Sequence, residues 1–80
     1  MDEAKTYEQL QGVFDDVFME PVVVTPTLTA RDVEEWDSLT HVSLVLAIER
    51  AFGIRFHVGE VESAQNVGDL VGLIRKRSGG

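Results

Sequence analysis

The pair Asp37-Ser38 is the most chemically suggestive feature of the sequence. Asp37 is predicted to be a helix N-cap, because its carboxylate can accept a hydrogen bond from a backbone N–H group that the first turn leaves unpaired. Ser38 would then open the helix with an exposed hydroxyl, close to free N–H donors and at the positive end of the helix dipole. Such a place favours an anion, including a phosphate ester carried on the hydroxyl. Capping alone would also explain an aspartate before a serine, so the pair does not decide the matter by itself.

The other reactive side chains form no recognisable catalytic or metal-binding pattern. His41 and His57 lack a paired ligand spacing. We expect His41 to be a partly buried, hydrogen-bonded residue on the core side of its helix, and His57 to lie in a loop. The sequence also has no cysteine, no glycine-rich phosphate loop, no nucleophile elbow and no metal-binding helix motif. No catalytic residue or metal ligand is assigned, the chain is not expected to be an enzyme, and any thiol chemistry must arrive on an attached group.

Apolar residues recur at helical spacing in three segments, which predicts an all-α fold. Thr6 is predicted to cap the first helix, and Pro21 ends its pattern. Asn66 is predicted to cap the last helix. Residues 22–35 form a long connection, and loops of this length in compact domains are often functional. One short helical turn is expected around residues 60–62.

The second helix, predicted from Ser38 to about Phe52 and ended by Gly53, is more apolar than packing on one side requires. Its apolar positions cover more than half of the circumference, whereas an amphipathic helix needs a narrower stripe. One group is interpreted as core: Leu44, Val45, Ile48 and Phe52. An adjacent group, beginning next to Ser38, is interpreted as a partly exposed docking strip: Leu39, Val42 and Leu46. Periodicity alone leaves open the alternative that all of these positions are buried.

The composition describes one small acidic domain over residues 1–80, with an ordered core from about 6 to 77. The net charge of −7 disfavours nucleic acid as a partner, because no basic stripe offsets phosphate charge. No apolar run is long enough to span a membrane, and the first residues lack the apolar stretch of a signal peptide. We therefore expect a soluble, cytoplasmic monomer that binds neither nucleic acid nor membrane.

The sequence resembles the signature of the acyl carrier proteins at Asp37-Ser38-Leu39, Val42, Leu44-Val45, Ile48-Glu49 and Phe52-Gly53-Ile54. The order of the predicted elements agrees with that family over nearly the whole chain. The resemblance implies a bundle of three main helices plus one short helix. It also implies that the chain is a discrete carrier protein, which holds acyl groups for other enzymes.

The same resemblance assigns roles to particular residues. Ser38 matches the serine to which a phosphopantetheinyl transferase attaches 4′-phosphopantetheine from coenzyme A, and Asp37 matches the aspartate beside it. The terminal thiol of the attached arm would carry the acyl group as a thioester. Four further residues match positions that meet acyl-loading and acyl-processing partner enzymes: Leu39, Val42, Leu46 and the acidic Glu49.

Two departures from the family pattern bear on the pathway. Glu35-Trp36 stands before Asp37 where carriers of fatty acid synthesis usually have a glycine, and the second helix is poor in carboxylates. This form looks more like carriers of polyketide or other specialised-metabolite pathways. Two alternatives stay open: an aminoacyl or peptidyl carrier, which usually has glycines and a histidine before the serine, and a helical adaptor that is never modified.

Overall fold

Three α-helices and two single turns of 3₁₀ helix build the part of the chain that the structure, a computed structural model, describes: residues 3–57 and 59–78. Along the chain the elements are α1 (Glu3–Val17), η1 (Ala30–Asp32), α2 (Ser38–Phe52), η2 (Val61–Ser63) and α3 (Val67–Arg77). Within these residues there is no strand, so the predicted all-α bundle of three main helices is confirmed, with the short helix present as the turn η2. None of the described helices is long and apolar enough to cross a membrane.

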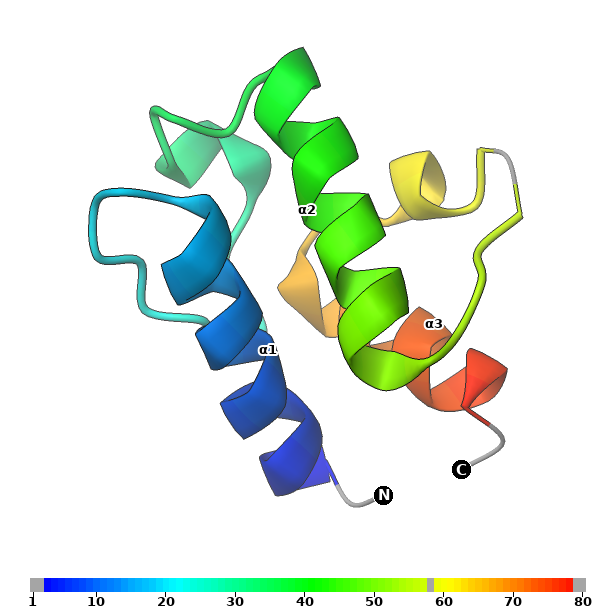
Figure 1. Cartoon of the computed structure of the whole chain (residues 1–80). Helices are drawn as coiled ribbons and strands as arrows, with labels where there is room; N and C mark the ends of the chain where they lie inside the picture. The colour runs from blue at the N-terminus through cyan, green and yellow to red at the C-terminus, as the bar shows by residue number, and fades with distance from the viewer. Residues whose placement is uncertain (1–2, 58, 79–80) are drawn as a thin grey trace.

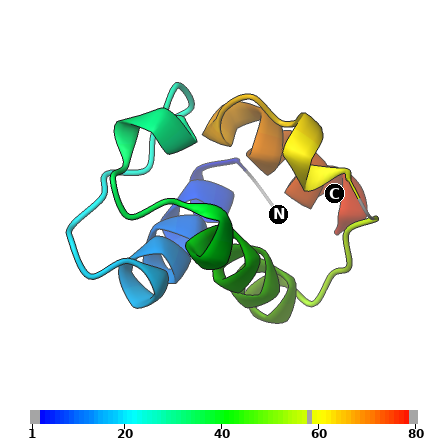
Figure 2. The same ribbon diagram turned by 90° about the horizontal axis from the view of Figure 1, so that it is seen from above.

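The helices are arranged around one apolar core. Figure 1 shows α1 and α2 side by side and running in opposite directions. Figure 2 shows α3, together with η1 and η2, on the other side of that pair. The buried apolar side chains are Leu10, Val13, Phe14, Phe18, Val33, Leu44, Ile48, Ile54, Val61, Val67, Leu70, Val71 and Ile74. Each of the three α-helices therefore contributes one face to the same core, as expected for amphipathic helices.

The start of α1 differs from the prediction. The helix begins at Glu3, so the assignment of Thr6 as its cap is wrong. Thr6 lies inside the helix and is fully buried. Glu3 is an acidic residue in the first turn, where it interacts favourably with the helix dipole, and this supports the earlier start. The helix ends at Val17, before Pro21 is reached.

The long connection between α1 and α2 is held to α1 by side-chain hydrogen bonds to its backbone. The Gln11 amide donates to the carbonyl oxygen of Val22 at 2.6 Å, and its oxygen accepts the N–H of Val24 at 2.9 Å. The Gln11 side chain thus pairs with the loop backbone through one donor and one acceptor, as a neighbouring β-strand would. These bonds satisfy backbone groups that an irregular segment would otherwise leave unpaired.

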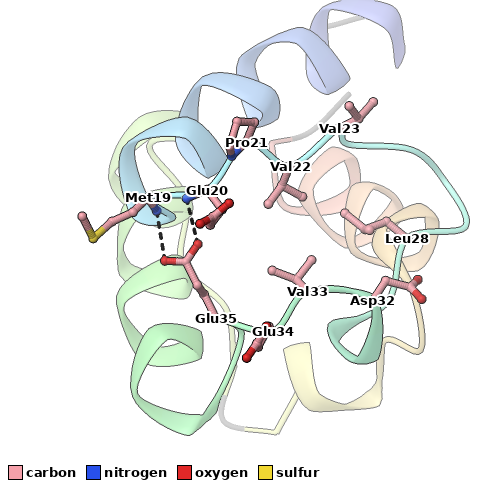
Figure 3. A pocket seen from close by; sticks show the side chains of 10 residues that line it. All are labelled: Met19, Glu20, Pro21, Val22, Val23, Leu28, Asp32, Val33, Glu34 and Glu35. Atoms are coloured by element: carbon pink, nitrogen blue, oxygen red, sulfur yellow. Dashed lines mark hydrogen bonds between the residues drawn. The ribbon is translucent and has the colours of Figure 1, made fainter.

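The Gln11 bonds act as one clamp on this loop, and Glu35, near the other end of the loop, forms a second clamp. The two carboxylate oxygens of Glu35 accept the N–H groups of Met19 and Glu20 at 3.1 and 2.8 Å. The clamp lies at the edge of an open hollow of about 800 Å³, which is lined by Val22, Val33 and other residues of the loop. Figure 3 shows these side chains and the two hydrogen bonds of Glu35. The Glu35 carboxylate thus accepts the N–H groups of two residues that lie just after the end of α1, where the chain leaves the helix.

The middle of the connection pairs with the N-terminus of α3. The carbonyl oxygens of Leu28 and Pro26 accept the N–H groups of Val67 and Gly68 at 2.8 and 2.9 Å. A Cβ at Gly68 would lie only 3.0 Å from the Pro26 oxygen, so any larger residue would press against the loop backbone here, whereas glycine allows the close approach. Asn66 caps the helix as predicted, because its side chain accepts a first-turn N–H at 2.9 Å.

Candidate functional site at the start of α2

Asp37 is the N-cap of α2, as predicted. Its Oδ1 accepts the N–H groups of Leu39 and Thr40, each at 3.0 Å. The Thr40 hydroxyl accepts the N–H of Asp37 at 2.8 Å, which closes a reciprocal capping box. The hydrogen bond from the Thr40 N–H is the main cause that lowers the pKa of the Asp37 carboxyl, with smaller help from the Thr40 hydroxyl and the Leu39 N–H. The first turn of α2 is therefore well fixed.

Ser38 follows at the first position of α2 and is exposed. Among the described residues, neither its hydroxyl nor its backbone N–H has a hydrogen-bond partner. Fewer N–H donors are free beside Ser38 than the sequence suggested, because the Asp37 carboxylate already accepts hydrogen bonds from the N–H groups of Leu39 and Thr40. The hydroxyl itself is unengaged, and an attached group at this position would displace no packed side chain. The accessible hydroxyl thus suits the attachment of a bulky phosphoester, whereas the site is poorly suited to binding a free anion.

Trp36 anchors the segment that leads to Ser38, a role that the sequence patterns missed. Its ring packs edge-on against Phe14, with centroids 5.5 Å apart, and lies 5.9 Å from Phe18. Its indole N–H donates to Nδ1 of His41 at 3.1 Å, and the two rings are stacked. A single large aromatic residue within the acidic run before Ser38 was the available signal.

The two groups of apolar residues on α2 differ in burial. Leu44 and Ile48 are fully buried, while Val45 and Phe52 are partly buried against the core. The docking strip is exposed: Leu39 by 81%, Val42 by 57% and Leu46 by 54%. The alternative in which all of these positions are buried is therefore wrong. An apolar strip that begins beside Ser38 is open to another molecule.

Glu49, the acidic residue matched to partner contact, lies differently from the strip. It is half-buried, and its Oε2 accepts the N–H of Phe56 at 2.8 Å. This bond fixes the chain as it leaves α2 through Gly53, whose φ of 65° is the left-handed conformation that glycine adopts readily. One carboxylate oxygen of Glu49 is thus occupied within the protein.

The two histidines lie where they were expected. His41 is half-buried and hydrogen-bonded, and His57 is exposed in the loop after α2. In residues 3–57 and 59–78, no three side chains of His, Cys, Asp or Glu are grouped so that they could hold a metal ion.

The fold and the exposed serine at the start of α2 define a small carrier domain. The family model described as a phosphopantetheine attachment site matches residues 8–74. The solution structure of holo acyl carrier protein from Geobacter metallireducens resembles the chain with a TM-score of 0.82 and 37% identity, covering 90% of this chain and 84% of that one. The chain belongs to the acyl carrier protein family, and 4′-phosphopantetheine is the group that it carries covalently.

Proposed function

We propose that Ser38 is the residue that receives 4′-phosphopantetheine, and that the protein carries acyl intermediates as thioesters on this arm. The observation that carries the proposal is the Ser38 hydroxyl, which is exposed and unengaged at the first position of a firmly capped helix. Its oxygen would form the phosphoester with the pantetheine-bearing phosphorus of coenzyme A, while the pyrophosphate bond breaks and adenosine 3′,5′-bisphosphate leaves. The chain contributes the hydroxyl and its position, and the transferase contributes the catalysis.

We further propose that the exposed strip Leu39, Val42 and Leu46 docks the phosphopantetheinyl transferase and the acyl-loading and acyl-processing enzymes. Its position next to Ser38 supports this, because a partner that reaches the arm also meets the strip. Asp37 supports docking indirectly by holding the first turn. Glu49 contributes the carboxylate oxygen that its bond to Phe56 leaves over.

The pathway that fits best is polyketide or other specialised-metabolite synthesis. On α2 the exposed or half-exposed polar positions include Thr40, Ser43 and Arg50, where carriers of fatty acid synthesis often have carboxylates. Charge complementarity sets encounter rates and partner choice, so docking to basic enzymes of fatty acid synthesis should be weaker. An aminoacyl or peptidyl cargo is the second candidate, and Asp37 before the serine disfavours it.

Intact-mass measurement tests the attachment. The protein is incubated with coenzyme A and a broad-specificity phosphopantetheinyl transferase, alongside Ser38→Ala and the matched control Ser43→Ala, which changes another exposed serine of α2. We expect one arm on the wild type and on Ser43→Ala, and none on Ser38→Ala. A folded wild-type protein without an adduct would instead favour the unmodified adaptor.

A further inference from the structure

The two ring nitrogens of His41 are in different situations. Nδ1 accepts the indole N–H of Trp36 at 3.1 Å. An indole N–H can only donate, so Nδ1 must present its lone pair and the neutral ring carries its hydrogen on Nε2. Nε2 is shielded from solvent and has no hydrogen-bond partner among the described residues. His41 therefore holds an oriented donor that the protein itself leaves unused.

The nearest acceptor does not satisfy this donor. Oε1 of Glu62, in the turn η2, lies 3.7 Å from Nε2, which is too long for a hydrogen bond. The Glu62 side chain is 64% exposed, so it can swing towards solvent without disturbing the core. Buried polar groups are normally paired, and an exception calls for an explanation such as a missing ligand.

A hollow lies beside this donor. It has a volume of about 250 Å³. Its lining combines the aromatic residues Trp36 and His41, the small or apolar residues Ala30, Val61, Ala64 and Leu70, and the polar residues Glu62, Gln65 and Asn66. Its wall combines the start of α2 with η2 and α3. His41 follows Ser38 by three residues, about one helical turn, so a chain tethered to Ser38 can fold back into this hollow.

We propose that His41 is a specificity-determining residue, whose Nε2–H donates a hydrogen bond to a carbonyl oxygen of the group tethered at Ser38 when that group enters the hollow. The inference rests on the proposed attachment of the arm at Ser38. The apolar part of the lining accepts the hydrocarbon part of the cargo, and the oriented Nε2–H of His41 pairs with one oxygen. Glu62 moves aside as the oxygen takes its place.

This arrangement separates cargoes by oxidation state. A saturated chain would leave the Nε2–H unpaired in a drier pocket, whereas a chain with a ketone near the thioester would pair it. A site built to donate a hydrogen bond discriminates against the analogue that lacks the acceptor. We therefore expect the hollow to favour a 3-oxoacyl chain over a saturated chain of the same length.

Nitrogen-15 NMR of the histidine rings tests the proposal on three forms of the protein: holo, butanoyl-loaded and 3-oxobutanoyl-loaded. Intact mass first verifies each form, so failure to load counts against the proposed function and is seen separately. We expect the His41 Nε2–H signal to move downfield and become protected from exchange, while exposed His57 serves as the internal reference. A change first seen with 3-oxobutanoyl would assign the oxygen to the ketone and support the proposal. A change already present in the holo or butanoyl form would place the oxygen on the arm or the thioester, which all cargoes share, and would overturn the role of His41 in specificity.

Two variants make the test decisive. In Glu62→Ala the change on loading should persist, because the acceptor belongs to the tethered group. The wild-type 3-oxobutanoyl form should melt roughly 3–6 °C above the butanoyl form, because only the ketone pairs with the donor, and His41→Phe should abolish this difference. The proposal is overturned if no form alters the His41 Nε2–H signal, or if the change vanishes in Glu62→Ala.

Discussion

Helices α2 and α3 are both capped and both amphipathic, yet they use their apolar residues differently. The apolar face of α3 is buried throughout: Val67, Leu70, Val71 and Ile74. α2 fully buries only Leu44 and Ile48 and leaves the strip Leu39, Val42 and Leu46 more than half exposed. Since burial of apolar surface stabilises a fold, the strip contributes little to folding. One helix thus serves mainly the core, while the other combines a narrow core contact with a surface suited to partners.

The largest expected effect sets a core leucine of α3 against a strip leucine of α2. Leu70→Ala should lower the free energy of unfolding by about 2–5 kcal/mol, because it leaves a cavity in the core. Leu46→Ala should stay within about 0.5 kcal/mol, as surface substitutions usually do. The same Leu46→Ala change should slow modification by a phosphopantetheinyl transferase by about 5-fold or more if the strip docks that enzyme. Urea unfolding and initial rates measure both, and an equal loss of stability in the two variants would refute the contrast.

A smaller effect compares the caps of the same two helices. Asp37→Ala and Asn66→Ala each remove a side chain that accepts first-turn N–H groups, and each should cost about 1 kcal/mol of stability. Only Asp37→Ala should also slow modification, because it loosens the turn that holds Ser38. Urea unfolding with parallel rate measurements checks this. If Asn66→Ala slowed modification as much, the two helix starts would not differ in function.

The smallest effect concerns acid stability at the end of α3. Arg77 binds Glu60 through two hydrogen bonds, Nε to Oε1 at 3.0 Å and Nη2 to Oε2 at 2.5 Å. The side-chain hydrogen bond from Arg77 is the main cause that lowers the pKa of Glu60 from 4.5 to about 2. The unfolded chain therefore binds more protons in this range, so the stabilisation is complete above about pH 4.5 and is lost as the pH falls through about 2.

Glu60→Gln should accordingly weaken the dependence of stability on pH between these two values. Chemical unfolding of both proteins at several pH values measures this slope. Identical slopes would show that the Glu60–Arg77 pair contributes nothing measurable, which is common for ion pairs near the surface. The hydrogen bonds that fix the start of α2 should be unaffected, since neither Glu60 nor Arg77 takes part in them.

Local signals predicted α2 and its neighbours well. Asp37 and Gly53 mark the start and end of α2, and both act through bonds within one turn of the helix. Asn66 predicted the start of α3 for the same reason. Thr6 misled, because a threonine that looks like a cap can equally be buried by tertiary packing inside a helix that begins earlier.

The remaining features depend on contacts between distant residues, which periodicity does not encode. The clamps from Gln11 and Glu35 bind loop N–H groups more than ten residues away in sequence. The Trp36–His41 pair arises because Phe14 of α1 and Phe18, which directly follows that helix, place the indole. The exposed docking strip could be proposed from the excess of apolar residues on α2, but only the packing of α1 and α3 decided which of them stay uncovered.

Locating the phosphopantetheine on the modified protein shows whether Ser38 bears the arm. Trypsin releases residues 32–50 as one peptide, which also contains the hydroxyls of Thr40 and Ser43. Fragmentation that preserves the phosphoester can separate the three positions. We predict the mass of one phosphopantetheine on every fragment that includes Ser38 and on none that contains only the later hydroxyls. An arm found on Thr40 or Ser43, or a fully unmodified peptide from folded protein, would show that Ser38 is not the attachment site.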